Sequence, residues 1–147
     1  MKARLKTRIT IKAKPASIFK YLGHTKYHLL WNPQMQSVTP TTQLKEGSVY
    51  TAQSMVLGVR IKAENHVTKY VQDEQLGLQN TTGTVQYAAQ FQLTTVGDAT
   101  LVTCTIAVSA EGRAFVFAKP MLEQLARREL HADLKALKEA VEQKLQP

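Results

Sequence analysis

The C-terminal part of the chain carries a long apolar stripe, which is the feature that most restricts the fold. From about Lys119 onward, apolar residues recur at spacings of three or four, and they are Leu122, Ala126, Leu130, Leu134, Leu137, Val141 and Leu145. This spacing predicts one amphipathic helix, roughly 40 Å long at 1.5 Å per residue. Because such a helix has only one apolar face, the rest of the chain must supply a surface that covers it.

The opening residues predict part of that surface. Cationic residues stand at even positions (Lys2, Arg4, Lys6, Arg8, Lys12, Lys14) and apolar residues at odd positions (Ala3, Leu5, Ile9, Ile11, Ala13). A period of two is typical of a strand with one buried face. We therefore expect the odd residues to face the long helix and the even cations to face outward, where they keep the sheet surface wet.

The middle of the chain indicates two short helices followed by six more strands. Pro15 suits the first turn of a helix that Gly23 ends, and a second short helix stops at Asn32-Pro33. Alternating stretches separated by turns then predict strands at 37–44, 48–57, 59–71, 76–82, 85–96 and 100–110. The predicted fold is α+β, a single domain over residues 1–147, with a curved seven-stranded antiparallel sheet wrapped around the C-terminal helix.

A curved sheet closed by one helix is expected to enclose a pocket, because one helix is too slender to fill the concave side. The apolar sides of the strands and the helix then supply the candidate wall residues Val67, Tyr87, Phe91, Ile106, Leu122 and Leu125. Two amides interrupt these apolar sides, Asn65 and Gln53, and a buried amide needs a partner from backbone, water or ligand. The parity of the strand that carries Gln53 is ambiguous.

Charge is distributed unevenly along the chain. The net charge is +8, and residues 1–45 contain nine Lys or Arg and no acidic residue. Such asymmetry suggests an anionic partner, and a peripheral contact with an anionic membrane is one interpretation. Simple solubility is the other. Nucleic acid is a less favoured partner, because no nucleic-acid-binding motif accompanies the charge.

The sequence contains no recognisable catalytic motif. His24 and His28 stand at a helical spacing that suits a metal, but neither a third ligand nor a neighbouring glutamate accompanies them. The single Cys104 lies in a strand-like run and is expected to be a buried thiol. We therefore predict no catalytic residue, no metal and no cofactor. The N-terminus is charged from residue 2 and lacks the apolar segment of a signal peptide, which indicates a cytoplasmic protein.

The order of these elements resembles the START-like, or SRPBCC, superfamily, and most closely its polyketide cyclase/dehydrase-type branch. The resemblance is carried by Pro15-Ala16 at the first helix, Trp31-Asn32-Pro33 after the second, Gly47 before the next strand, and "VGDATLVTCTIAV" near the last strand. It implies a helix-grip fold around a cavity for an apolar or amphipathic small molecule. It also places Trp31 at the pocket, either as a lid or as a plug between the short helices and the sheet.

Three functions remain open at this point. The leading one is binding of a hydrophobic or amphipathic small molecule, such as a lipid or polyketide-like compound, in the internal cavity. The second is a polyketide cyclase or dehydratase, which requires polar side chains that converge inside the pocket. The third is a module that binds anionic membrane or RNA through the basic N-terminal face. The sequence specifies no oligomeric state.

Overall fold

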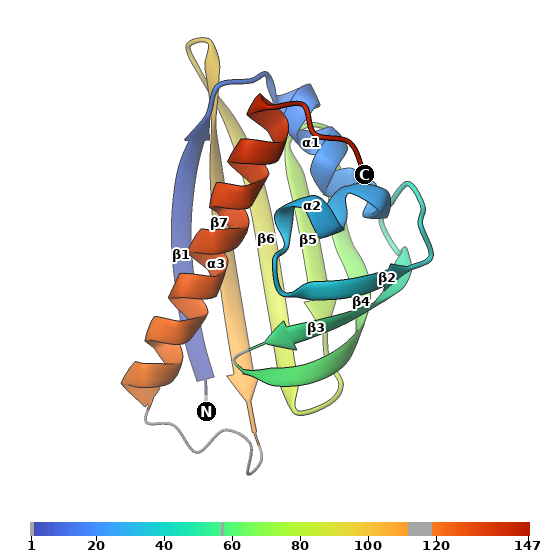
Figure 1. Cartoon of the computed structure of the whole chain (residues 1–147), viewed down its shortest axis with the longest axis vertical. Helices are drawn as coiled ribbons and strands as arrows, with labels where there is room; N and C mark the ends of the chain where they lie inside the picture. Colours follow the sequence, from blue (N-terminus) through green and yellow to red (C-terminus); the bar gives the residue numbers. More distant parts are fainter. Residues whose placement is uncertain (1, 57, 112–118) are drawn as a thin grey trace.

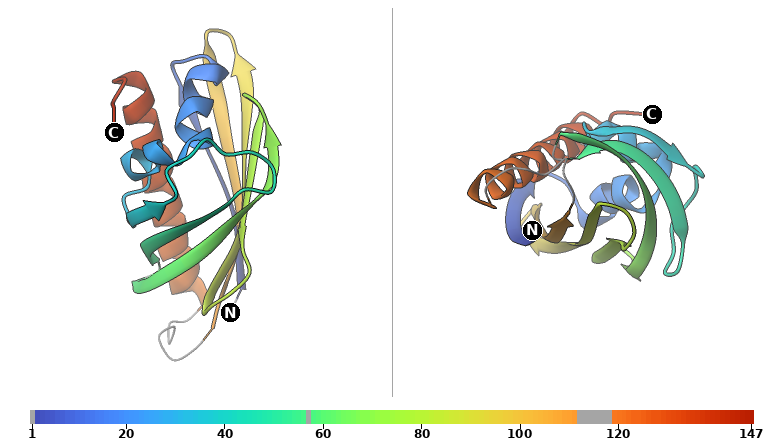
Figure 2. Two further views of the ribbon diagram at one scale, coloured as in Figure 1. Left: turned by 90° about the vertical axis from the view of Figure 1, so that its right-hand side faces the viewer. Right: turned by 90° about the horizontal axis from the view of Figure 1, so that it is seen from below.

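The computed structural model of the chain describes residues 2–56, 58–111 and 119–147. Seven antiparallel strands form one sheet in the order β1-β7-β6-β5-β4-β3-β2. The strands are β1 (Lys2–Ile11), β2 (Met35–Thr39), β3 (Val49–Val56), β4 (Val59–Val71), β5 (Gln75–Asn80), β6 (Val85–Val96) and β7 (Ala99–Ala110). The sheet curves strongly, so that β2, β3 and β4 wrap around toward the helix that crosses β1 and β7 (Figures 1 and 2).

The long helix α3 (Lys119–Glu142) lies across the concave side of this sheet (Figure 1). Between β1 and β2 come α1 (Pro15–Gly23), a 3-10 turn η1 (Thr25–Tyr27) and α2 (His28–Trp31), which together cover one end of the concave side. The predicted α+β helix-grip architecture, with two short helices after the first strand, is therefore confirmed. No helix among the described residues has the length and apolar content needed to cross a membrane.

Strand β2 differs in position from its prediction. It runs over Met35–Thr39 and ends just before Pro40, whereas the sequence indicated residues 37–44 with the proline inside. Proline has no N–H to give to a sheet ladder, so the strand ends where its pairing would require one. β2 is an edge strand with a register shift between Met35 and Ser37.

The alternation of β1 has the predicted orientation. Ala3, Leu5 and Ile11 are buried on the concave side, and Lys2, Arg4, Lys6 and Arg8 are exposed on the convex side. The odd residues contribute to one continuous core. The largest fully buried side chains of this core include Ile11, Ile18, Phe19, Leu22, Leu134 and Leu137. These residues, together with Ala140, come from β1, α1 and the C-terminal half of α3, and we refer to them as the packed end.

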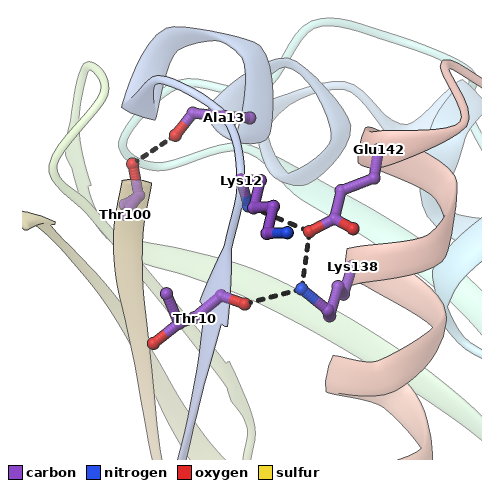
Figure 3. A network of polar contacts seen from close by, with 6 residues as sticks. All are labelled: Thr10, Lys12, Ala13, Thr100, Lys138 and Glu142. Atoms are coloured by element: carbon purple, nitrogen blue, oxygen red, sulfur yellow. Dashed lines mark hydrogen bonds and ion pairs between the residues drawn. The ribbon is translucent and has the colours of Figure 1, made fainter. Parts of the chain in front are cut away.

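Polar contacts fix the C-terminal half of α3 to the end of β1 (Figure 3). The backbone N–H of Lys12 donates to Glu142 Oε2 at 2.9 Å, and Lys138 Nζ donates to the same oxygen at 2.6 Å and to the Thr10 carbonyl at 2.9 Å. These two donors, the Lys12 N–H first, lower the pKa of Glu142. The helix is therefore clamped at its end and cannot slide along the sheet without losing charge-assisted hydrogen bonds.

Candidate functional site

The concave side encloses a cavity of about 140 Å³ next to the N-terminal half of α3. The cavity exists because small side chains line it where the packed end has large ones. Ala52 and Ala63 stand opposite each other on β3 and β4, and Ala89 on β6 and Ala126 on α3 also border it. Each alanine leaves space that a leucine or phenylalanine would fill, and one helix does not supply enough other side chains to replace it.

Most of the cavity wall is apolar, and its polar groups come from several elements. We refer to the wall residues together as the hollow end. The apolar members from the sheet and helices are Trp31, Met35, Ala52, Val56, Ile61, Ala63, Leu78, Val85, Ala89, Phe91, Ile106, Val108, Ala126 and Leu130. The polar members, with the thiol, are His28, Asn32, Gln34, Tyr50, Ser54, Asn65, Tyr87, Cys104, Glu129 and Asp133. An apolar chamber with a few placed polar groups is the usual composition of a small-molecule site.

Two tyrosines and an asparagine form one polar part of the wall. Tyr50 on β3 pairs in register with Asn65 on β4, and the hydroxyl of Tyr87 on β6 donates to Asn65 Oδ1. Burial raises the pKa of Tyr87 to about 12, against a lowering by its hydrogen bond to Asn65. Burial also raises the pKa of Tyr50. Both phenols are therefore neutral donors near neutral pH.

His28 and Trp31 bring α2 to the cavity. His28 is 1 % exposed, and its Nε2 lies 2.8 Å from the carbonyl of Leu22. A carbonyl only accepts, so Nε2 carries the proton and Nδ1 is left as an acceptor with no partner. Burial lowers the pKa of His28 to about 4, so the ring is neutral. Trp31 Nε1 donates to the carbonyl of Tyr21, and its ring meets Phe91 edge-on.

Two carboxyl groups of α3 reach the cavity one turn apart. Glu129 and Asp133 both line it, and Oδ1 of Asp133 is buried without a hydrogen-bond partner. Burial, with the negative charge of Glu129 beside it, raises the pKa of Asp133 well above its usual range. The pKa of the buried Cys104 thiol rises to about 12, through burial and through the nearby Asp133. The thiol is therefore protonated, as expected for a structural cysteine.

The structure brings five of the nine residues predicted for the pocket wall to the cavity. These are Trp31, Asn65, Tyr87, Phe91 and Ile106. Val67 and Leu122 are buried in the core, and Leu125 packs against the core without lining the cavity. The placement of Gln53 was wrong. Even residues of β3 face inward, so Gln53 is exposed on the outer side, opposite Lys62.

Trp31 combines the two roles that were considered for it. It is 3 % exposed and holds α2 through the Tyr21 carbonyl, which is the role of a plug. It also lines the cavity, so it closes one side of the space.

Sequence reasoning missed the polar groups that matter most here. Asp133 is not among the candidates from the sequence, because charged residues on an amphipathic helix usually face solvent. His28 was considered only as a metal partner of His24. Instead, His28 Nε2 donates to the carbonyl of Leu22, and His24 Nδ1 accepts from the Lys26 N–H. The sequence does contain one signal for the inward orientation of Asp133. It follows Glu129 by one helical turn and Ala126 by two turns, which places it near the apolar stripe.

The outer face carries two separate cationic regions and not one. Lys2, Arg4, Lys6 and Arg8 are exposed along β1, an edge strand. Arg60 and Lys62 are exposed on β4, with β7, β6 and β5 between the two strands. The intervening strands contain no charged residue and present mainly glutamines and threonines. Among the described residues, the exposed cations of β1 and those of β4 therefore form two regions and not one continuous patch.

Comparisons with known proteins agree on the fold. A START superfamily protein from Mycobacterium smegmatis is 19% identical, with a TM-score of 0.82 over 97% of this chain and 99% of that chain. The Zhui aromatase/cyclase from Streptomyces sp. R1128 is 15% identical, with a TM-score of 0.80 over 98% of this chain and 96% of that one. The protein Ara h 8.0201 is 12% identical, with a TM-score of 0.71 over 97% of this chain and 99% of that chain. At these identities the likeness establishes the fold alone.

Sequence comparison gives the family. None of the curated proteins matches the chain. The sequence profile of the family described as "Polyketide cyclase / dehydrase and lipid transport" matches residues 2–142, which is nearly the whole chain. The seven-stranded helix-grip sheet, the cavity beneath its long helix and this match lead to one conclusion: the chain belongs to the polyketide cyclase/dehydrase and lipid transport family of START-like proteins.

Proposed function

We propose that the protein binds a compact apolar or amphipathic small molecule in the cavity between the sheet and α3. The observation that carries the proposal is the cavity itself, whose wall is mainly apolar with polar groups at a few positions. An unfilled space of this kind lowers stability, because its wall loses dispersion contacts and gains nothing in return. A bound guest restores those contacts.

The size of the cavity restricts the guest. A cavity of about 140 Å³ is close to the engineered space of about 150 Å³ that binds benzene in a protein core. It suits a single ring or a short chain better than a two-chain lipid. The polyketide-like class considered from the sequence fits this size when the ligand is small or when only one of its rings enters.

Extraction and displacement together test this proposal. Organic solvent extraction of the purified protein followed by mass spectrometry should give a small apolar compound. The single-ring fluorophore 4-(dimethylamino)benzonitrile, whose emission depends on the polarity around it, should bind saturably and be displaced by toluene. Absence of both an extracted compound and saturable binding would contradict the proposal.

A matched pair of variants shows whether the binding occurs in the cavity. Ala126→Leu places a larger side chain in the cavity and should abolish probe binding. Ala136→Leu, at a partly buried position on the same helix that does not line the cavity, should leave binding intact. Equal effects of the two substitutions would place the probe elsewhere.

An enzymatic role is the second candidate, because titratable side chains converge on the cavity. Asp133 with a raised pKa, neutral His28 and the Tyr87 hydroxyl are groups that general acid–base chemistry uses. Such groups suit the aldol-type closure and dehydration of a poly-β-ketone. Incubation with a short poly-β-ketone thioester should then change the ratio of cyclised products, and Asp133→Asn should reverse the change. An unchanged product ratio would exclude this role for that substrate.

A further inference from the structure

One residue of the cavity wall presents a buried hydrogen-bond acceptor without a partner. His28 lines the cavity, and its Nε2 lies 2.8 Å from the carbonyl of Leu22. Nε2 therefore carries the ring proton, and Nδ1 is an acceptor to which no group of the described residues donates. A buried acceptor left unpaired costs about 1–3 kcal/mol. A guest of the cavity that donates one hydrogen bond to Nδ1 thus gains over an equally large guest that donates none.

The His28 ring is held in this orientation by its surroundings. It meets the rings of Trp31 and Tyr50 edge-on, with centroids 5.2 Å and 5.6 Å away. A half-turn of the imidazole would put a carbon where Nε2 now stands, so the Leu22 carbonyl would lose its donor. The acceptor is therefore in place before a guest arrives, and binding does not have to order this side chain.

The charge state of the wall favours a neutral donor. Among the wall residues that the structure describes, none is Lys or Arg, and burial keeps the His28 ring neutral by lowering its pKa. Burial also favours the protonated form of Asp133, because it raises the pKa of that carboxyl group well above its usual range. A carboxylate guest would find no cation there, and an ammonium guest would first have to ionise Asp133. A neutral hydroxyl compound meets neither obstacle.

We propose that the guest carries a hydroxyl group, which donates to Nδ1 of His28 while the apolar body of the guest lies against the alanine-lined wall. This inference rests on the proposed function, since it names the chemical class of the guest in the same cavity. A hydroxyl group also accepts, and the neutral phenol of Tyr50 in the same wall is a donor for its oxygen. The apolar body fills the space that Ala63 and Ala126 border.

Two isomeric ring compounds test the inference, because they contain the same atoms and differ in the donor. p-Cresol carries a hydroxyl group and anisole carries a methyl ether, while toluene is the apolar reference and benzoate the anionic one. Shifts of the alanine methyl resonances of the protein give the four affinities. p-Cresol should bind about three- to tenfold more tightly than anisole, which is the size expected of one net hydrogen bond. Benzoate should bind most weakly.

The nitrogen resonance of His28 Nδ1 reports the contact directly in protein labelled with nitrogen-15 at histidine. An unprotonated imidazole nitrogen shifts upfield when it accepts a hydrogen bond. p-Cresol should therefore move this resonance upfield, and anisole and toluene should leave it nearly in place. Its loss in the His28→Phe variant assigns it among the histidine signals.

His28→Phe also tests the preference itself, because it keeps a ring and removes the acceptor. The variant should lose the preference for p-cresol over anisole, and retained toluene binding shows that it is folded. His131→Phe is the matched control at an exposed position on α3 and should keep the preference. If His28→Phe does not fold, the Nδ1 resonance of the wild type decides.

The possible outcomes separate this inference from the proposed function. Binding of toluene and anisole without preference for p-cresol, as a water molecule already bound to Nδ1 would produce, would overturn the hydroxyl proposal and leave the proposed function standing. The same holds for a preference without a shift of Nδ1, a preference kept in His28→Phe, or tighter binding of benzoate. No saturable binding of toluene, anisole or p-cresol would contradict the proposed function itself.

Discussion

The packed end and the hollow end use the same helix and the same sheet but differ in side-chain size. At the packed end, Phe19, Leu134 and Leu137 are almost completely buried, and so is the small side chain of Ala140. At the hollow end, alanines stand on β3, β4, β6 and α3 around one space. The same helix can thus anchor the fold with one half and form the wall of a site with the other. Local side-chain volume, and not the topology, decides which half of the helix packs closely and which half borders the cavity.

The largest effect is expected from a cavity made at the packed end. Leu137→Ala removes a fully buried side chain and should lower the free energy of unfolding by about 2–5 kcal/mol. Chemical denaturation measures the change. Leu29→Ala, at a position that is 47% exposed, should change stability by less than about 0.5 kcal/mol. A similar small loss for Leu137→Ala would show that the packed end is not closely packed.

The second prediction concerns acid stability at the hollow end. The folded pKa of His28 is about 4, below its usual 6.5, so the unfolded chain binds this proton better. Its contribution to stability is complete above pH 6.5 and is lost as pH falls toward 4, by about 3 kcal/mol in total. Asp133 acts in the opposite direction, since its raised pKa makes the folded state bind a proton more tightly.

Variants separate the two groups. His28→Gln should remove most of the loss of stability between pH 6.5 and 4, and the exposed His131→Gln should leave it in place. The slope of the unfolding free energy against pH is the quantity to compare. An unchanged slope in His28→Gln would mean that His28 is not buried as a neutral ring.

One substitution made at both ends of α3 compares them directly. Ala140→Leu adds volume where the core is full and should destabilise the protein by about 1–3 kcal/mol. Ala126→Leu adds the same volume beside the cavity and should leave stability unchanged or raise it by up to about 1 kcal/mol. Thermal unfolding of the two variants gives the comparison. Equal losses would remove the distinction between the ends.

The smallest effect is expected from the polar clamp at the end of α3. Glu142→Gln weakens the hydrogen bonds from Lys12 and Lys138 and should cost about 0.5–1 kcal/mol above pH 5. Because the folded pKa of Glu142 is lowered, its contribution is present above the unfolded pKa and is lost as pH falls through the folded value. The variant and the wild type should therefore converge in acid. A constant difference at all pH values would indicate that the charge of Glu142 is not involved.

Much of the fold could be predicted because its periodicities are strong and local. The alternation of β1 and the leucine spacing of α3 specify which faces are buried, and both were confirmed from Leu122 to Val141. The predicted stripe was wrong at Leu145, which lies beyond the end of α3 and is exposed. The parity of β3 could not be read, since Tyr50 and Val49 are both apolar neighbours of opposite orientation. That ambiguity caused the misplacement of Gln53. The position of Pro40 just after β2, and not inside it, depended on where the sheet pairing ends, which is a tertiary property.

The candidate site was harder to predict than the fold. Tyr87, Phe91 and Ile106 follow from strand parity, because it places them on the concave side of central strands. Which inward residues border space and which are packed depends on the volumes of neighbours from distant parts of the sequence. Val67 and Leu122 illustrate this, since both are inward and buried but reach no space. Asp133 faces the cavity against the usual preference of a carboxylate for water.

The account depends most on the claim that the hollow end admits a guest and the packed end does not. Methyl-labelled alanines report on both ends in one titration with toluene. The methyl resonances of Ala52, Ala63, Ala89 and Ala126 should shift saturably, and that of Ala140 should stay in place. Absence of saturable shifts at the four cavity alanines, or equal shifts at Ala140, would contradict it.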